Sequence, residues 1–182
     1  MVAQQTKTKL TYEDYKNTPE DERYELIDGE LIMAAAPKEV HQRVDMRLGA
    51  KFFVHVETND LGEVYSAPFD VYLTENNVVQ PDLLFVSKER LEIITEANVQ
   101  GAPDLVVEIL SPSTASTDWT VKRELYAKHG VKEFWIVAPD ARLVWLMLLR
   151  GDDYEVVGIY GDGQTVTSTV IEGFSVNLND IF

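Results

Sequence analysis

Three ionisable side chains, Asp82, Glu108 and Lys122, stand in apolar parts of the sequence. Glu108 is flanked by Val107 and Ile109 in the strand-like run "DLVVEIL", and Asp82 precedes the apolar run "LLFV". An ionised carboxylate in such surroundings needs a cation or hydrogen-bond donors beside it. Two such carboxylates together could bind a divalent metal ion, Mg²⁺ or Mn²⁺, because both ions prefer oxygen ligands.

The two runs that carry Asp82 and Glu108 predict neighbouring strands. If the connection over residues 87–103 reverses the chain, the strands lie antiparallel and the start of the first meets the end of the second. Asp82 then lies beside Glu108, since opposed residues on neighbouring strands are about 5 Å apart. Two carboxylates this close repel each other, and one pKa rises unless a cation lies between them. We therefore expect both carboxylates, about 4–6 Å apart, to bind one cation.

A lysine on a predicted helix provides a third group. Residues 116–130 have helical periodicity, and at about 100° per residue Lys122 falls in the middle of the apolar face, between Trp119 and Leu125. A lysine pointing inward from this helix can pair with the carboxylates or act on a substrate. The alternative is an ion pair with Asp118, four residues earlier, in solvent.

The remaining pattern predicts a hairpin, a helix and several more strands. Asp28 and Gly29 favour a two-residue turn, and residues 39–56 carry apolar side chains at four-residue spacing, which indicates an amphipathic helix. Further predicted strands cover residues 62–73 and 77–86, joined by a turn at 74–77, then 104–110, 132–139, 142–150 and 154–161, and residues 173–182 are expected to dock onto the body.

These elements predict an α/β (α+β) fold with an αβββαβ core. Its sheet is mixed and flanked by helices, because the helix between the strands at 104–110 and 132–139 implies a right-handed crossover and a parallel pair. An N-terminal hairpin and a C-terminal antiparallel extension complete it. A chain of 182 residues suffices for a single domain, residues 1–182, in which residues 1–10 are expected to be flexible.

Composition restricts the kind of partner and compartment. The sequence has no apolar stretch as long as a membrane span and no signal-peptide pattern, so we expect a cytoplasmic protein without a membrane partner. The absence of cysteine excludes disulfides and thiolate chemistry. The net charge of −15 repels polyanions, so a nucleic-acid partner requires a local basic patch or a metal ion.

The motifs around these residues resemble the PD-(D/E)XK nuclease superfamily. More closely, "ELIDGEL", "QPDLLFV", "DLVVEILSPST", "DWTVKRELY" and "GVKEFWIV" resemble a family of restriction-endonuclease-like proteins formerly classed as a domain of unknown function. The resemblance extends from about Thr11 to the C-terminus. It implies a restriction-endonuclease-like core in which Asp82 and Glu108 bind Mg²⁺, and metal-activated water hydrolyses phosphodiester bonds of nucleic acid, with DNA as the expected substrate.

The sequence departs from the superfamily pattern at one position. The lysine expected two residues after Glu108 is replaced by Leu110. The resemblance implies that Lys122 on the following helix has taken over its catalytic role. His41 also matches a family position and is either an auxiliary residue near the site or a surface histidine at the start of a helix.

The first predicted helix carries a basic stripe. Arg43, Arg47 and Lys51 follow one another at four-residue spacing, and like charges at this spacing repel mildly. The stripe is either a phosphate-contact surface or an ordinary solvated helix face.

Two functions remain open from the sequence. The first is a metal-dependent endonuclease, favoured by intact Asp82, Glu108 and Lys122. The second is a catalytically inactive binding or assembly module built on the nuclease core, favoured by the strong negative charge. The strands at 142–150 and 154–161 are more apolar than the core requires, so we expect a homodimer or higher homo-oligomer that covers them.

Overall fold

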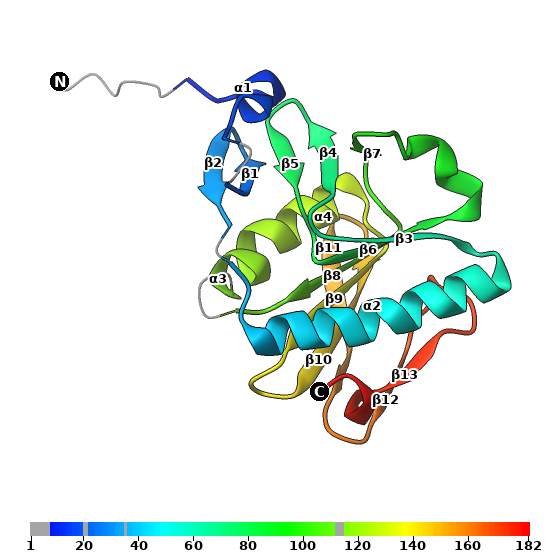
Figure 1. The fold of residues 1–182 in the computed structure, drawn as a ribbon. Coiled ribbons are helices and arrows are strands. Elements are labelled where there is room, and N and C mark those ends of the chain that lie inside the picture. Colours follow the sequence, from blue (N-terminus) through cyan, green and yellow to red (C-terminus); the bar gives the residue numbers. More distant parts are fainter. Residues whose placement is uncertain (1–7, 20–21, 35, 112–114) are drawn as a thin grey trace.

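The computed structural model describes residues 8–19, 22–34, 36–111 and 115–182. A six-stranded mixed sheet runs through the middle of the molecule in the order β11-β10-β9-β8-β6-β3 (Figure 1). Its strands are β3 (Gly62–Ser66), β6 (Leu83–Ser87), β8 (Leu105–Ile109), β9 (Glu133–Ala138), β10 (Leu143–Arg150) and β11 (Asp153–Tyr160). Strands β8 and β9 are parallel, whereas the other neighbours are antiparallel.

A second sheet of five short strands has the order β2-β1-β5-β4-β7. Its strands are β1 (Tyr24–Ile27), β2 (Glu30–Met33), β4 (Asp70–Thr74), β5 (Asn77–Val79) and β7 (Asn98–Gln100). The predicted hairpin is confirmed as β1–β2, and its turn residues Asp28 and Gly29 have φ of 50° and 77°. Positive φ at both positions is what a tight hairpin turn between twisted strands requires.

The prediction of two continuous strands at residues 62–73 and 77–86 was wrong. Each run divides between the two sheets: β3 and β6 pair in the six-stranded sheet, whereas β4 and β5 pair in the five-stranded sheet. The breaks fall at Pro68 and Pro81, since proline has no N–H to donate to a strand ladder. The turn at residues 74–77 is confirmed and joins β4 to β5.

Helix α2 (Glu39–Asn59) covers one face of the six-stranded sheet (Figure 1). Its buried side chains recur every four residues at Val44, Leu48, Phe52 and Val56 and pack in one hydrophobic cluster with the strands. The C-terminal segment, with β12 (Thr165–Thr167), β13 (Ser175–Asn177) and η3 (Leu178–Asp180), joins the same cluster through six buried apolar side chains, Val166, Ile171, Phe174, Val176, Leu178 and Ile181. The predicted docking of this segment is therefore confirmed.

The opposite face carries the second helical segment. It consists of α3 (Ala115–Thr117), the π-helical turn η2 (Asp118–Lys122) and α4 (Arg123–His129), and it ends at Gly130 in the left-handed conformation. This segment leads from β8 to the parallel β9, so α2, β3, β6, β8, the helical segment and β9 form the predicted αβββαβ core. The antiparallel extension β10–β11 is also confirmed.

The remaining short helices connect or begin the chain. They are α1 (Tyr12–Lys16) and η1 (Lys88–Ile93). Of residues 1–10, predicted to be flexible, residues 1–7 lie outside the described part, while the backbone N–H of Leu10 donates to Gly29 O at 2.9 Å. Among the helices of the described residues, none has the length and apolar character needed to cross a membrane.

Candidate active site

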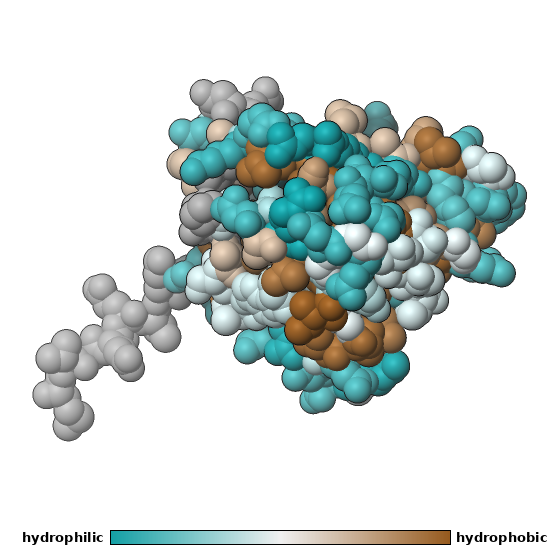
Figure 2. Space-filling view, turned by 90° about the horizontal axis from the view of Figure 1, so that it is seen from below, coloured by the Kyte–Doolittle hydropathy of each residue, from teal (hydrophilic) through white to brown (hydrophobic). Residues whose placement is uncertain are grey.

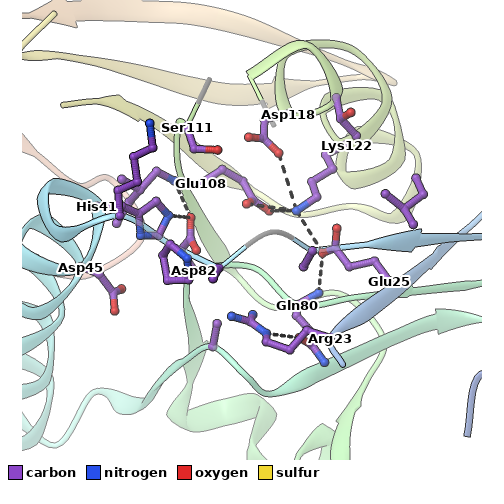
Figure 3. A pocket seen from close by; sticks show the side chains of 18 of the residues that line it. Arg23, Glu25, His41, Asp45, Gln80, Asp82, Glu108, Ser111, Asp118 and Lys122 are labelled. Atoms are coloured by element: carbon purple, nitrogen blue, oxygen red, sulfur yellow. Dashed lines mark hydrogen bonds and ion pairs between the residues drawn. The ribbon is translucent and has the colours of Figure 1, made fainter. Parts of the chain in front are cut away.

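The two predicted carboxylates lie at neighbouring strand ends. Strands β6 and β8 are antiparallel and adjacent, as predicted, and Leu83 opposes Val107, so that Asp82 stands opposite Glu108. Asp82 Oδ2 accepts a hydrogen bond from the Ile109 N–H at 2.6 Å. Figure 3 shows both carboxylates on the wall of one pocket. Their joint binding of a cation stays a prediction.

Glu108 is buried, and its charge is matched by donors from the helical segment. Lys122 Nζ lies 3.1 Å from Oε1 and 3.2 Å from Oε2, and the Tyr126 hydroxyl donates to Oε1 at 2.6 Å. Lys122 is only 5% exposed, so it points inward as the helical periodicity predicts. The partners of Glu108 thus lie outside its own apolar run, because they are 14 and 18 positions later in the sequence, on the helical segment.

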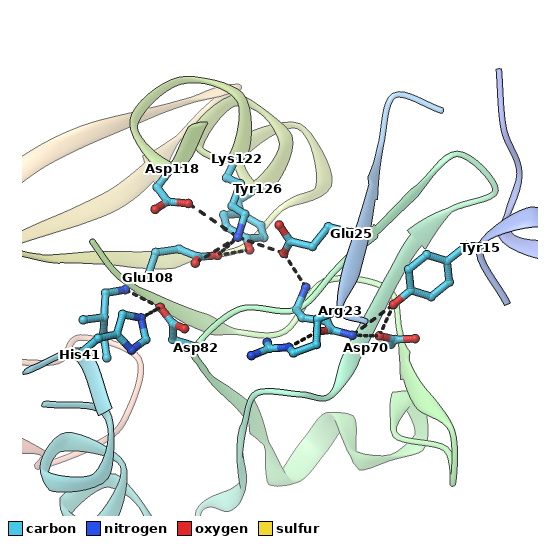
Figure 4. Close-up of polar contacts among 12 residues, drawn as sticks. Tyr15, Arg23, Glu25, His41, Asp70, Asp82, Glu108, Asp118, Lys122 and Tyr126 are labelled. Atoms are coloured by element: carbon cyan, nitrogen blue, oxygen red, sulfur yellow. Dashed lines mark hydrogen bonds and ion pairs between the residues drawn. The ribbon is translucent and has the colours of Figure 1, made fainter. Parts of the chain in front are cut away.

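Lys122 contacts two further carboxylates. Glu25 Oε1, on β1, lies 3.0 Å from its ammonium nitrogen, and Asp118 Oδ1 lies 3.6 Å away (Figure 4). The two alternatives for Lys122 thus occur together, but Asp118 is 1% exposed and lies inside the molecule, not in solvent. Burial alone would lower the pKa of Lys122, yet Glu108, Glu25 and Asp118 raise it well above its usual value.

The pocket holds more negative than positive charge. Burial raises the pKa of Glu108 well above its ordinary value, and Asp118, Asp82 and Glu25 add to this, while Lys122 opposes it. A single ammonium group cannot neutralise several carboxylates around it. An additional cation would relieve this repulsion.

His41 and Asp45 of α2 form the side of the pocket next to Asp82 (Figure 3). His41 Nε2 lies 3.2 Å from Asp82 Oδ2. Burial disfavours the charged imidazole, but Asp82, Asp45 and Asp118 outweigh it and raise the pKa of His41. Burial and the charge of Asp82 raise the pKa of Asp45 to about 6. His41 is thus placed beside the site and is not a surface residue.

The helical segment is locally widened where it faces the pocket. Asp118–Lys122 forms a π-helical turn between α3 and α4. Such turns insert an extra residue into a helix and are frequent at functional sites. In this chain the turn begins with Asp118 and ends with Lys122, and both side chains are buried against Glu108.

The pocket has a volume of about 310 Å³ and is open to solvent on one side. Beyond the buried acids, its lining includes Arg23 and Lys38 as basic groups and Ile32 and Met33 of β2 as partly exposed apolar groups. A pocket lined by both carboxylates and basic groups suits a ligand that carries a phosphate and binds with a metal ion.

The basic stripe of α2 lies elsewhere. Arg43 pairs with Glu39, Arg47 Nη1 donates to the Phe182 carbonyl, and Lys51 pairs with Asp180. None of the three basic residues lines the pocket in the described structure. Arg47 and Lys51 hold the C-terminal segment against α2. The contacts of the stripe give no support to a role in phosphate binding, and that role stays a prediction.

The side chains of the pocket fit a divalent cation of the Mg²⁺ type. Asp82 and Glu108 offer hard oxygen ligands at adjoining positions, and the local charge is in excess. Within the described residues no group of three or more His, Asp or Glu side chains is placed to hold a metal ion. Mg²⁺ commonly binds through one or two carboxylates, with water and phosphate oxygens completing its shell.

Sequence reasoning missed Glu25 and Asp45, although each had a signal. Glu25 stands two positions before Ile27 on β1, so the two side chains share one face of the strand. Because Ile27 is buried in the core between the sheets, the same periodicity predicts that Glu25 points inward. Asp45 follows His41 by four residues and therefore shares its side of α2.

A protein family and two known proteins are similar to this chain. Residues 11–179 match the Uma2 family, described as "Putative restriction endonuclease". The chain belongs to this family. An uncharacterized Synechocystis sp. protein, slr1290, is 26% identical over 148 residues, which cover 80% of this chain and 76% of that protein.

The same fold occurs in a crystal structure from Anabaena variabilis described as "a putative nuclease belonging to DUF820". It superposes with a TM-score of 0.79 at 19% identity, covering 95% of this Uma2-family chain and 97% of the other. At this identity the similarity establishes the fold and leaves the reaction to be inferred from the pocket.

Proposed function

We propose that this protein is a divalent-cation-dependent endonuclease that hydrolyses phosphodiester bonds of nucleic acid, with DNA as the expected substrate. The observation that carries the proposal is the convergence of Asp82, Glu108 and Lys122, from β6, β8 and the helical segment, in one open pocket. Family membership supports a nuclease-type function, and the residues proposed for it line the pocket.

Asp82 and Glu108 are the proposed ligands of Mg²⁺ or Mn²⁺. The bound cation would supply an activated water and stabilise negative charge on the phosphate. Asp82 is oriented by the Ile109 N–H, which donates to Oδ2, and His41 Nε2 lies 3.2 Å from the same oxygen. The chain thus fixes one ligand before any cation arrives, which lowers the cost of binding.

Lys122 is proposed as the catalytic cation. With three carboxylates within 3.0–3.6 Å it is an ammonium donor, not a base. A fixed ammonium group in a poorly solvated pocket stabilises negative charge that develops on a phosphate oxygen, or holds the attacking water. Arg23 and Lys38, which also line the pocket, would contact flanking phosphates.

A second candidate function is a nuclease-fold binding or assembly module without turnover. Lys122 occupies both oxygens of Glu108, and the stripe residues Arg43 and Lys51 are engaged with acidic side chains. With a net charge of −15, these contacts leave few basic groups for a long duplex. A single experiment separates this function from the endonuclease.

The experiment combines metal binding with cleavage. Wild-type protein, Asp82→Ala and the exposed control Asp152→Ala are titrated with Mg²⁺ and Mn²⁺ in a thermal shift assay. They are then incubated with plasmid, duplex DNA, single-stranded DNA and RNA, with chelator as a blank. The endonuclease requires a metal-dependent rise in Tm and metal-dependent cleavage, both lost in Asp82→Ala and kept in Asp152→Ala. Stabilisation without cleavage of any substrate favours the module.

A homodimer or higher homo-oligomer is proposed for the assembly. Strand β11 is an edge of the six-stranded sheet and exposes Val156, Val157 and Ile159 by 46%, 43% and 56%. An apolar edge strand of this length invites pairing with a second copy. Figure 2 shows hydrophobic side chains gathered among hydrophilic ones on the face seen from below.

A further inference from the structure

Glu25 enters the pocket from a different sheet than Glu108. It lies on β1 of the five-stranded sheet, is 7% exposed, and contacts Lys122 Nζ at 3.0 Å. Figure 4 shows Glu25 and Glu108 on opposite sides of the ammonium group. The ammonium group of Lys122 is therefore held by one carboxylate from each of the two sheets.

The carboxylate of Glu25 is itself fixed. The backbone N–H of Gln80 donates to Glu25 Oε1 at 2.8 Å. The side chain of Gln80 donates to Asp70 at 2.9 Å and to the Tyr15 hydroxyl at 3.2 Å, and it accepts from Arg23 Nε at 3.2 Å. Gln80 stands two residues before Asp82, so one short segment positions Glu25 and the proposed metal ligand Asp82 together.

The Lys122 ammonium group and a divalent cation would compete for the carboxylate of Glu108. In the structure both of its oxygens contact Lys122, and Oε1 also accepts from Tyr126. A divalent cation at Glu108 would weaken the hold on the ammonium group through competition and charge repulsion. Asp118 lies farther away, at 3.6 Å, and belongs to the same helical turn as Lys122. Glu25 is the remaining anchor from a separate element.

We propose that Glu25 is a positioning residue for Lys122: it keeps the ammonium group in the pocket when the Glu108 carboxylate is engaged by a cation. This inference rests on the proposed nuclease function for its biological meaning. The anchoring itself is a property of the described contacts and is measurable without metal or substrate.

Chemical labelling of Lys122 tests the anchoring. Glu108→Gln reproduces a Glu108 whose charge no longer holds Lys122, and brief acetylation followed by mass spectrometry compares Lys122 with the exposed Lys128 in the same protein. We expect Lys122 to react at least about tenfold more slowly than Lys128 in wild type and in Glu108→Gln, because a held side chain is protected. In the double variant Glu25→Gln with Glu108→Gln, we expect Lys122 to approach the rate of Lys128.

Both other outcomes overturn the proposal. If Lys122 stays protected in the double variant, Asp118 or packing holds it; if Glu108→Gln alone releases it, Glu25 is no anchor. Circular dichroism of each variant establishes that it is folded. The same substitution at exposed Glu63 of β3 serves as a control and should leave labelling unchanged.

Kinetics then test the consequence for the proposed reaction. Glu25→Gln should lower kcat by about 10- to 100-fold, since a misplaced catalytic group costs this much, while KM and the Kd for Mn²⁺ stay within about twofold of wild type. Glu25→Asp, which keeps the charge, should recover part of kcat. A wild-type protein without cleavage defeats the proposed function, whereas labelling still decides the role of Glu25.

Discussion

Lys122 is positioned by carboxylates from several elements of the fold. Its ammonium nitrogen lies 3.0 Å from Glu25, 3.1 Å from Glu108 and 3.6 Å from Asp118. Water is replaced as its solvent by three carboxylates, which stabilises the charged form and fixes its direction. A lysine held in this way acts as a preorganised positive charge and does not have to reorient during a reaction.

The residue-scale prediction concerns Lys122→Ala. We expect cleavage to be lost, by at least about 100-fold in kcat, because the charge that would stabilise the phosphate is removed. Binding of Mn²⁺, followed by calorimetry, should persist, since Asp82 and Glu108 remain. The matched variant Lys128→Ala, on the exposed side of α4, should change neither quantity. Equal cleavage by the two variants would exclude a catalytic role for Lys122.

At the scale of elements, the edge pairing of β3 with β6 depends on Gly62. Its φ is +144°, and a Cβ atom there would come within 2.1 Å of the Val86 carbonyl oxygen. We expect Gly62→Ala to lower the free energy of unfolding by about 3 kcal/mol or more, measured by urea denaturation. Gly151→Ala, at φ +66° with no atom within 4 Å of the added Cβ, should cost only about 1 kcal/mol. Equal losses would contradict the steric explanation.

Asp104, directly before β8, connects the start of this strand to neighbouring segments of the chain. Its buried carboxylate accepts from the Ser87 N–H at 2.8 Å and pairs with Arg90 at 2.9 Å and Lys132 at 2.7 Å. Burial alone would raise the pKa of Asp104, but Lys132, Ser87 and Arg90 outweigh it, so the pKa lies below its ordinary value. The ionised form is therefore the one that stabilises the fold.

The prediction from Asp104 is a stability difference that depends on pH. Asp104→Asn should lower the free energy of unfolding by about 2–3 kcal/mol at pH 7. A group with a lowered folded-state pKa contributes fully above its unfolded value of about 4 and loses this contribution as the pH falls through the folded value. The gap between wild type and variant, measured by denaturation from pH 7 to pH 3, should therefore narrow toward acid. A gap that is constant with pH would show that the charge of Asp104 is not responsible.

At the scale of the whole molecule, the six-stranded sheet ends in β11 on one side. Pairing of β11 with β11 of a second copy would extend the sheet across the dimer and bury apolar side chains that solvent now contacts. The charge of −15 opposes association, so salt should strengthen it by screening.

The assembly prediction is tested with Ile159→Lys. A lysine at this edge position adds charge where two copies would meet, so we expect light scattering to show the monomer mass, whereas wild type shows a dimer or larger. Met46→Lys, at a 71% exposed residue of α2, is the control and should leave the mass unchanged. A wild-type monomer at high protein concentration would rule out the self-association.

Much of the site could be predicted from local sequence patterns. The apolar runs around Asp82 and Glu108 determined two buried strands, and the helical period of 3.6 residues determined that Lys122 points inward. These features depend on neighbours a few positions away, and the sequence displays such neighbours directly. The αβββαβ order followed from the same periodicities together with the handedness of the β8–β9 crossover.

Tertiary structure alone decided which partners meet. Glu25 contacts Lys122 across 97 positions of the chain, and Gln80 holds Glu25 across 55. Nor does a helical pattern reveal that Lys51 is engaged by Asp180 of the C-terminal segment. Such contacts arise when separate elements pack, because the burial of apolar faces sets the relative positions of the sheets and helices and carries the polar side chains with them. The sequence thus determined which groups are turned inward, and packing determined the set of charges that surrounds each one.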